Sequence, residues 1–182
     1  MDESIDIWDT DGQPTGRVAL KSAAHRNGWF HPTVHIWFYT REGEILLQRR
    51  AKDKATFPDL WDVSVAGHIQ AGETPALGAV REIHEEIGIE VTSSELNFIG
   101  LYRAVHQHPY GLMDCEFHHI YLCELKYKVS ELLLQETEVA DLRLTPKSIL
   151  EKEICTWNPT ERLVPHGRQY YKKINEALGF LL

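Results

Sequence analysis

The feature that most constrains this chain is an acidic, amphipathic stretch at residues 67–89, GHIQAGETPALGAVREIHEEIGI. Pro75 lies where the first turn of a helix tolerates proline, and Gly88 lies where a helix commonly ends. The stretch therefore predicts a helix over residues 73–88. At about 100° per residue, its apolar side chains share one face that we expect to pack on a β-sheet. The residues of this predicted stripe are Ala76, Val80, Ile83 and Ile87.

Three glutamates of the predicted helix fall on a second arc and lie next to one another. Glu82 is three residues before Glu85 and four before Glu86, a spacing that makes the side chains neighbours. Like charges at this spacing repel each other and destabilise a helix. A tight cluster of oxygen ligands suits a hard divalent cation, with Mg²⁺ first and Mn²⁺ as a substitute. The alternative is a solvated acidic face that binds no metal.

The order and spacing of the fixed residues in this stretch resemble a known signature. These residues are Gly67, Glu73, Arg81, Glu82, Ile83, Glu85, Glu86, Gly88 and Ile89. Their pattern resembles the Nudix box: Gly, five residues, Glu, seven residues, Arg-Glu, an aliphatic residue, any residue, Glu-Glu, any residue, Gly and an aliphatic residue. Every fixed position of that box is matched, so chance is a poor explanation of the resemblance.

The resemblance implies a catalytic metal site. In Nudix enzymes the carboxylates hold Mg²⁺ on a diphosphate, which implies that Glu82, Glu85 and Glu86 are metal ligands here. Gly67 permits a tight turn that could aim a backbone carbonyl at the same ion. Arg81 lies among acidic neighbours on the helical wheel, and we expect it to form a structural ion pair.

The remaining sequence predicts an α/β fold. The six segments with strand-like patterns are residues 34–40, 45–50, 61–69, 96–105, 116–125 and 139–144, and the two with helical patterns are 148–154 and 166–178. Because strands and helices are mixed along the chain, we expect a mixed β-sheet. With the resemblance above, this predicts a Nudix-type α/β/α sandwich. A length of 182 residues fits a single domain over residues 1–182.

The composition restricts the cellular compartment and the class of binding partner that we expect. A net charge of −8 argues against a nucleic-acid polymer or an anionic membrane as the partner. A small anionic substrate remains compatible, because a metal ion can invert the local charge. The N-terminus lacks the pattern of a secretory signal, and the three cysteines lack CxxC spacing. We expect a cytoplasmic protein, and the sequence leaves its oligomeric state open.

The segments around the box resemble a second group, the isopentenyl diphosphate isomerases. The resemblance covers about residues 5–125 and is carried by AAHRNGWFHPTV, LLQRRAKDKATFPDLWDVSVAGH and YGLMDCEFHHIYL. In that family three histidines and two acidic residues hold a metal, which implies a second site, for a transition metal. The alternative is a set of structural histidines without a metal. The matching positions are His25, His31, His68, Asp114 and Glu116.

The chain departs from the isomerases in ways that bear on the reaction. The first two matching histidines are one residue closer together than in bacterial isomerases, and Asp114 replaces a glutamate. Ala66 occupies the position of an isomerase cysteine that transfers protons, and a methyl group can neither donate nor accept a proton. The isomerase sequences also depart from the Nudix box, whereas every fixed position of the box is present here. These departures favour hydrolysis over isomerisation.

Basic residues that could contact phosphate cluster after the second predicted strand. Arg49, Arg50 and Lys54 are the candidate substrate-binding residues, because Arg and Lys both suit phosphate. Lys54 matches a diphosphate-contacting lysine of the isomerases. Strand alternation places Arg49 and Arg50 on opposite faces, so we expect one of them at most to face the substrate. The alternative is a solvated strand end.

These observations predict an Mg²⁺-dependent hydrolase that cleaves a phosphoanhydride bond in a small organic diphosphate, such as a nucleotide or a related metabolite. The catalytic candidates are Glu82, Glu86 and Glu116, and Glu136 and Glu138 are further candidates for the general base. Two alternatives stay open: an enzyme that isomerises prenyl diphosphates, and a non-catalytic module that binds a diphosphate. The identity of the diphosphate also stays open.

Overall fold

A computed structural model, which describes residues 2–155 and 163–181, contains a seven-stranded mixed β-sheet. The strand order is β5-β4-β3-β8-β7, and β6 pairs with β3 while β9 pairs with β4. The central pair of β3 and β8 is parallel, whereas β4 and β6 both run antiparallel to β3. The strands are β3 (His31–Tyr39), β4 (Glu44–Arg50), β5 (Trp61–Asp62), β6 (Val65–His68), β7 (Asn97–Gln107), β8 (Met113–Glu124) and β9 (Val139–Pro146).

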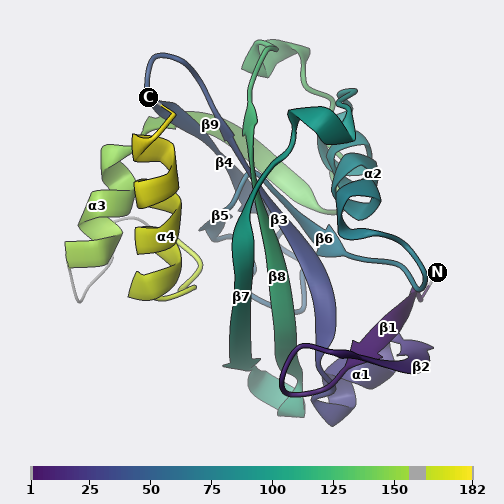
Figure 1. Ribbon diagram of the computed structural model, residues 1–182. Coiled ribbons are helices and arrows are strands. Elements are labelled where there is room, and N and C mark those ends of the chain that lie inside the picture. The colour runs from purple at the N-terminus through teal and green to yellow at the C-terminus, as the bar shows by residue number, and fades with distance from the viewer. Residues whose placement is uncertain (1, 156–162, 182) are drawn as a thin grey trace.

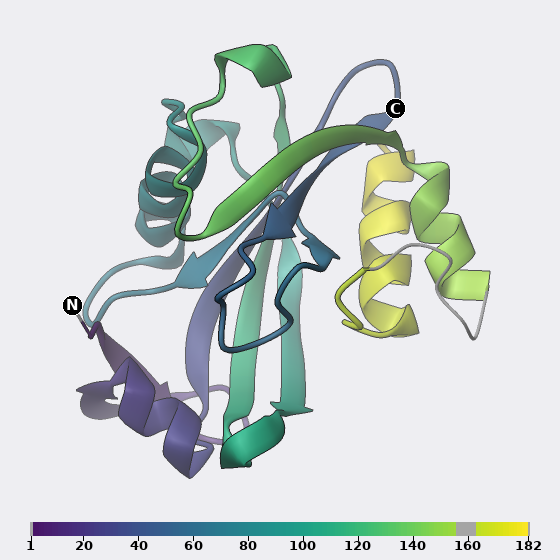
Figure 2. The same ribbon diagram turned by 180° about the vertical axis from the view of Figure 1, so that it is seen from behind.

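Helices cover both faces of this sheet (Figure 1). The helix α2 (Pro75–Ile87) lies on one side, and α3 (Ser148–Cys155) and α4 (Arg168–Gly179) lie together on the other. The view from behind shows the same separation (Figure 2). The expected α/β class, with a mixed sheet between helical layers, is therefore confirmed. An N-terminal unit lies beside one end of the sheet and comprises β1 (Ser4–Trp8), β2 (Pro14–Leu20) and α1 (Lys21–Asn27).

The central strand β3 connects the two halves of the core, because all nine of its residues are buried. Side chains alternate along a strand, so successive residues enter opposite layers. Val34, Ile36 and Phe38 pack in the cluster that contains the apolar face of α2. Trp37 and Tyr39 pack in the cluster that contains α4. A strand buried on both faces has the nearly continuous apolar run that the sequence shows here.

Two features of the fold were not specified by the sequence patterns: the pairing between β3 and β4, and the N-terminal unit. β3 and β4 are antiparallel, but only Tyr39 and Ile45 are paired, since β3 pairs with β6 over residues 33–36 instead. The N-terminal elements were not predicted, because β2 is exposed along most of its length and carries no apolar alternation. Its neighbour α1 has only seven residues, too few for a clear helical period.

The buried face of α2 is rotated relative to the predicted stripe. Ile83 and Ile87 are fully buried as expected, whereas Ala76 and Val80 are only partly buried. Ala79, outside the predicted stripe, is fully buried instead. The rotation arises because β6 contacts the side of α2 that carries the glutamates. The carboxylates of Glu82 and Glu86 therefore border the core and do not face bulk water.

Three short 3-10 helices complete the described elements: Ser93–Glu95, Pro109–Gly111 and Val129–Glu131. Within residues 2–155 and 163–181, no helix is long and apolar enough to cross a bilayer. Cys115 and Cys123 are both buried and free. The described part of the chain has four apolar clusters, of which the two largest lie on the two faces of the sheet.

Shortening Ile83 should destabilise the fold, because its side chain is completely buried between α2 and the sheet. We expect Ile83→Ala to lower the free energy of unfolding by about 2–5 kcal/mol. Leu77→Ala on the same helix is the control, since Leu77 is 54% exposed and should change stability by less than about 0.5 kcal/mol. Urea denaturation of both variants measures the difference, and equal losses would contradict this view of the core.

Candidate active site and metal centres

One cavity of about 810 Å³ brings together most of the residues singled out in the sequence. The glutamates of α2 border it on one side, and the loop after β4 contributes Arg50 and Lys54. β3 and β8 supply its inner wall with polar side chains on the same face as Trp37. Each central strand is therefore apolar under α4 and polar where it enters the cavity.

The carboxylates of α2 differ in their exposure. Glu82 and Glu86 are only 7% and 4% exposed, whereas the side chain of Glu85 is 43% exposed. The helix that carries them begins at Thr74, whose hydroxyl accepts a hydrogen bond from the backbone N–H of Leu77. It ends at Gly88 in the left-handed conformation, which favours glycine.

The strand β6 fits against these carboxylates because it has no side chain at Gly67. A Cβ atom placed there would lie 1.9 Å from the carboxyl carbon of Glu82. One residue earlier, the backbone N–H of Ala66 donates to Glu86 Oε2 over 3.4 Å. The tight turn expected at Gly67 is not found, because Gly67 lies within β6 and is paired with Val34. Its role is to allow the close approach of the strand to the helix.

Arg81 is the centre of an ion-pair network at the open edge of α2. Its guanidinium donates to both carboxylate oxygens of Glu73, at 3.1 and 2.9 Å, and to Glu82 at 2.8 Å. It also donates to Glu85 at 3.1 Å and to the backbone carbonyl of His68 at 2.8 Å. Arg81 thus connects α2 to the end of β6, in agreement with a structural role.

Burial makes the two inner carboxylates hard to ionise in the absence of a cation. Burial raises the pKa of Glu82 to about 7, although the neighbouring Arg81 opposes this shift. The pKa of Glu86 is raised well above its usual range by burial, by Glu82 and by Glu138. A bound cation would stabilise the ionised form of both carboxylates. A cluster of oxygen donors of this kind fits a hard divalent cation.

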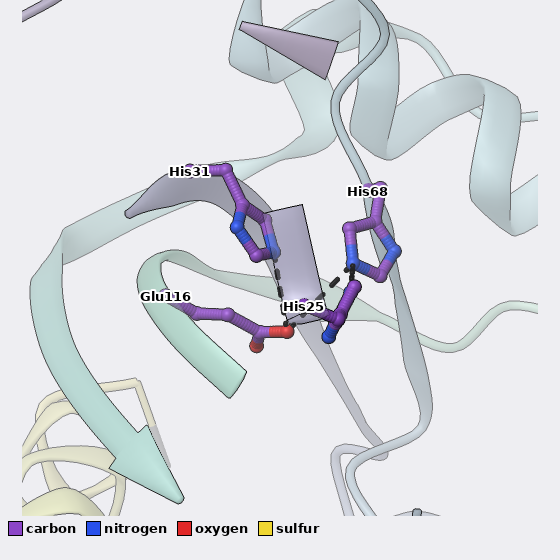
Figure 3. Close-up of side chains that lie close together, drawn as sticks. All are labelled: His25, His31, His68 and Glu116. Carbon is purple, nitrogen blue, oxygen red and sulfur yellow. Dashed lines mark hydrogen bonds and ion pairs between the residues drawn. The ribbon is translucent and has the colours of Figure 1, made fainter. Parts of the chain in front are cut away.

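A second cluster joins three histidines and one glutamate from four separate elements (Figure 3). His25 comes from α1, His31 from β3, His68 from β6 and Glu116 from β8. One potential ligand atom from each lies within 4.8 Å of all the others. The β-sheet register explains the convergence, because His31 and Glu116 are directly paired across β3 and β8.

The individual contacts in this cluster leave room for a metal. His25 Nε2 and His68 Nε2 are 3.1 Å apart, and Glu116 Oε1 lies 3.6 Å from His31 Nε2 and 3.7 Å from His68 Nε2. The buried His31 Nε2 has no hydrogen-bond partner among the described residues. Imidazole and carboxylate ligands of this kind suit a transition metal.

Asp114 lies behind the cluster. Its carboxylate accepts hydrogen bonds from His25 Nδ1 and His108 Nε2, each over 2.7 Å. On the other side, His31 Nδ1 donates to the backbone carbonyl of Trp29 over 2.8 Å. Such partners commonly orient the imidazoles that bind a metal. The structure therefore gives Asp114 a contact to His25, and adds His108, which the sequence did not suggest.

Glu116 connects this cluster to further polar residues of the cavity. Its second oxygen lies 3.4 Å from His118 Nδ1, whose ring is buried. Burial would raise the pKa of Glu116, but the nearby imidazoles of His31, His118 and His68 hold it well below its ordinary value. Glu116 is therefore an anionic carboxylate surrounded by imidazoles.

The candidate phosphate-binding residues divide into those that line the cavity and one that does not. Lys54 borders the cavity and forms an ion pair with Glu138, and Arg50 borders it while donating to Asp62 Oδ2 at 3.2 Å. Arg49 lies outside the cavity lining, near Asp59 and Asp141. The expected separation of Arg49 from Arg50 thus follows strand alternation.

Three buried histidines of the cavity were missed in the sequence: His35, His118 and His166. Two of them carried a detectable signal. His35 is four residues after His31, and His118 is two residues after Glu116, so each shares the strand face of a candidate ligand. His166 has no such signal, because it reaches the cavity from a segment before α4 that is remote in sequence.

Four residues of the box border one cavity, namely Gly67, Glu82, Glu85 and Glu86, and a family model agrees with this arrangement. The NUDIX domain model matches residues 29–166. The chain belongs to the Nudix family. The match includes both the box and the central β-sheet, and the helical layers on the two sides of that sheet complete the expected Nudix fold.

The relatives that resemble the chain are named either as Nudix hydrolases or as isopentenyl-diphosphate isomerases. Nudix hydrolase 3 of Arabidopsis thaliana is 30% identical over 93% of this chain, which spans only 23% of that protein. An uncharacterised Nudix hydrolase of Clostridium acetobutylicum is 38% identical over 78% of this chain and 68% of its own length. The isopentenyl-diphosphate Delta-isomerase of Escherichia coli is 30% identical over 76% of this chain and 74% of its own.

Solved structures with low sequence identity share the fold. The DR0079 protein of Deinococcus radiodurans has a TM-score of 0.67 and 19% identity, with 94% of this chain and 98% of that chain covered. The MutT protein of Methanosarcina mazei has a TM-score of 0.62 and 18% identity, with 82% and 95% covered. These similarities support the fold alone, because the identities are low.

Adding a side chain at Gly67 should disturb the carboxylate site. We expect Gly67→Ala to weaken Mg²⁺ binding by about 10–100-fold, since the new methyl group would overlap Glu82 and push its carboxylate away. Isothermal titration calorimetry measures the affinity. Gly179→Ala is the control, because a Cβ atom there meets nothing within 4 Å. Unchanged Mg²⁺ affinity in a folded Gly67→Ala protein would contradict a metal site at Glu82.

Proposed function

We propose that this protein hydrolyses a phosphoanhydride bond in a small organic diphosphate, such as a nucleotide or a related metabolite. The observation that best supports the proposal is the pair of buried carboxylates, Glu82 and Glu86, held against β6 at the wall of the cavity. Burying charge without compensation is costly. The oxygen-only donor set fits Mg²⁺, with Mn²⁺ as a substitute.

The residues around the carboxylates have distinct roles in this proposal. Bound Mg²⁺ supplies charge neutralisation of the diphosphate and acidifies the attacking water. Glu82 and Glu86 hold the ion, Glu85 approaches it from the exposed edge, and Gly67 offers its backbone carbonyl. Lys54 borders the same cavity and offers a positive point charge to a phosphate group.

A carboxylate on the cavity wall would accept the proton of the attacking water. Glu138 borders the cavity beside Lys54 and is close enough to influence the pKa of Glu86. Glu116 borders it among the histidines, whereas Glu136 is exposed and is not part of the lining. We therefore place Glu138 first as the general base and Glu116 second.

We also propose that His25, His31, His68 and Glu116 bind a transition metal. The free nitrogen of the buried His31 and the convergence of four ligand atoms support this proposal. Burial holds the pKa of His68 well below its ordinary value, which favours the neutral imidazole that a metal needs.

The proposed setting is the cytoplasm. A reducing compartment is compatible with the buried free thiols of Cys115 and Cys123. The net charge of −8 supports a small molecule as the partner in preference to a nucleic-acid polymer. A screen of nucleoside diphosphates and triphosphates, nucleotide sugars, prenyl diphosphates and thiamine diphosphate, with Mg²⁺ and with EDTA, tests the reaction through released phosphate or monophosphate.

Removing the charge of Glu86 should reduce turnover strongly. We expect Glu86→Gln to lower the rate by about 10²–10³-fold, because glutamine keeps the shape of the side chain but loses the charge that holds the cation. Steady-state kinetics at saturating Mg²⁺, on the best substrate of the screen, measure the effect. Glu90→Gln is the matched control, since the Glu90 side chain is 81% exposed. Near-normal turnover of Glu86→Gln would contradict the assignment.

The isomerase relatives make isomerisation of a prenyl diphosphate the second candidate function. Moving a double bond requires an acid and a base on opposite faces of the substrate. Glu116 could serve one face. Ala66 borders the cavity but offers only a methyl group. The absence of a proton-transfer group at Ala66 therefore favours hydrolysis over isomerisation.

We expect the unmodified protein to show no proton exchange into isopentenyl diphosphate. Ala66→Cys should gain at most a trace, because catalytic groups need placement to within about 0.5 Å and supporting contacts. NMR of samples in deuterated water measures the exchange, with Ala66→Ser as the control for a small polar side chain. Robust exchange by the unmodified protein would overturn the preference for hydrolysis.

A further inference from the structure

A third cluster of potential ligands lines the same cavity and adjoins the first histidine cluster where Glu116 approaches His118. His35 on β3, His118 on β8 and His166 before α4 each offer one ligand atom, and these atoms lie within 4.8 Å of one another. The three residues are only 4%, 2% and 9% exposed. Buried polar side chains of this kind normally have hydrogen-bond partners for both ring nitrogens.

Each of the three rings is held through one of its nitrogens. His35 Nδ1 is 2.7 Å from the hydroxyl of Tyr170, and His118 Nδ1 is 2.8 Å from the hydroxyl of Thr33. His166 Nε2 is 2.6 Å from Asp62 Oδ1. A carboxylate or hydroxyl on the far nitrogen is the arrangement that orients imidazoles in metal sites.

The opposite nitrogens of two of these rings have no partner. His118 Nε2 and His166 Nδ1 are buried and make no hydrogen bond among the described residues. Because the carboxylate of Asp62 can only accept, His166 Nε2 carries the proton and Nδ1 presents its lone pair. Leaving a buried acceptor unpaired is unfavourable. Water does not reach these buried nitrogens. A metal ion needs less space than a water molecule, because it approaches a ring nitrogen to about 2.1 Å.

We propose that His35, His118 and His166 bind a transition-metal ion with the ligand preference of Zn²⁺. A point equidistant from three atoms that are at most 4.8 Å apart lies within about 2.8 Å of each, compared with about 2.1 Å for a zinc–nitrogen bond. To bind the ion, each ligand atom therefore has to move inward by less than about 1 Å. The rings of His35 and His118 are stacked at 3.9 Å, so one of them rotates to direct its lone pair at the ion.

The burial of the three rings agrees with this site, because neutral imidazole is the form that binds a metal and burial disfavours the charged form. Three protein ligands leave a fourth position that faces the cavity, where water or an oxygen of a bound molecule can bind.

The test counts metal ions and does not depend on the proposed hydrolysis. Chelator-treated protein is incubated with Co²⁺ in excess Mg²⁺, and the Co²⁺ retained after desalting is measured per chain. The set comprises the unmodified protein, His68→Ala, which removes one ligand of the first histidine cluster, His166→Asn, and the double variant. His166→Asn leaves the contact between Glu116 and His118 in place.

We expect His166→Asn to lose one equivalent of Co²⁺ per chain, both alone and when added to His68→Ala. The visible spectrum of the His68→Ala protein should show four-coordinate Co²⁺. His119→Asn is the matched control, because His119 follows His118 on β8, faces the other side of the sheet and should not alter the metal content.

His35→Asn provides a second removal of a ligand in case His166→Asn does not fold, and circular dichroism checks both variants. Loss of one equivalent in either folded variant supports the site. Retention of all bound Co²⁺ in folded His166→Asn and His35→Asn overturns it. A Zn²⁺-soaked crystal without an anomalous peak between the three rings also overturns it.

Discussion

The interaction on which the rest of the site depends is the contact between the buried carboxylates of α2 and the strand β6. Glu82 occupies the space beside Gly67 that any larger residue would fill, and Arg81 connects the helix to the carbonyl of His68. Burial raises the pKa of Glu82 and Glu86, so the metal-free fold holds carboxylates that favour a proton or a cation. Burying these carboxylates without a compensating cation costs stability at this position.

The parallel pairing of β3 with β8 organises the rest of the cavity. The register places His31 opposite Glu116 and Thr33 opposite His118. Both strands are apolar where helices cover them and polar where they enter the cavity, so one pair of strands serves the core and the site together. The histidine clusters therefore depend on the β-sheet register, in which a slip of one residue would turn every side chain to the other face.

Hydrolases and isomerases share this scaffold, so a small number of side chains decides the reaction. The cavity wall retains His25, His68 and Glu116 at positions that match the isomerases, but Ala66 offers no proton-transfer group. The box on α2 is complete, and its inner carboxylates are buried in the wall of the same cavity. An alanine beside an intact carboxylate site favours chemistry at phosphorus over chemistry at carbon.

The sequence alone determined the class of the fold and the identity of the box, because both follow from local periodicity and fixed spacing. The helical period set the arc of Glu82, Glu85 and Glu86, and the spacing around Ala66 revealed the missing cysteine. Tertiary structure alone decided which carboxylates are buried, the contact of Asp114 with His25, and the meeting of His166 with His35 and His118. These contacts depend on the packing of segments distant in the chain, which no local pattern specifies.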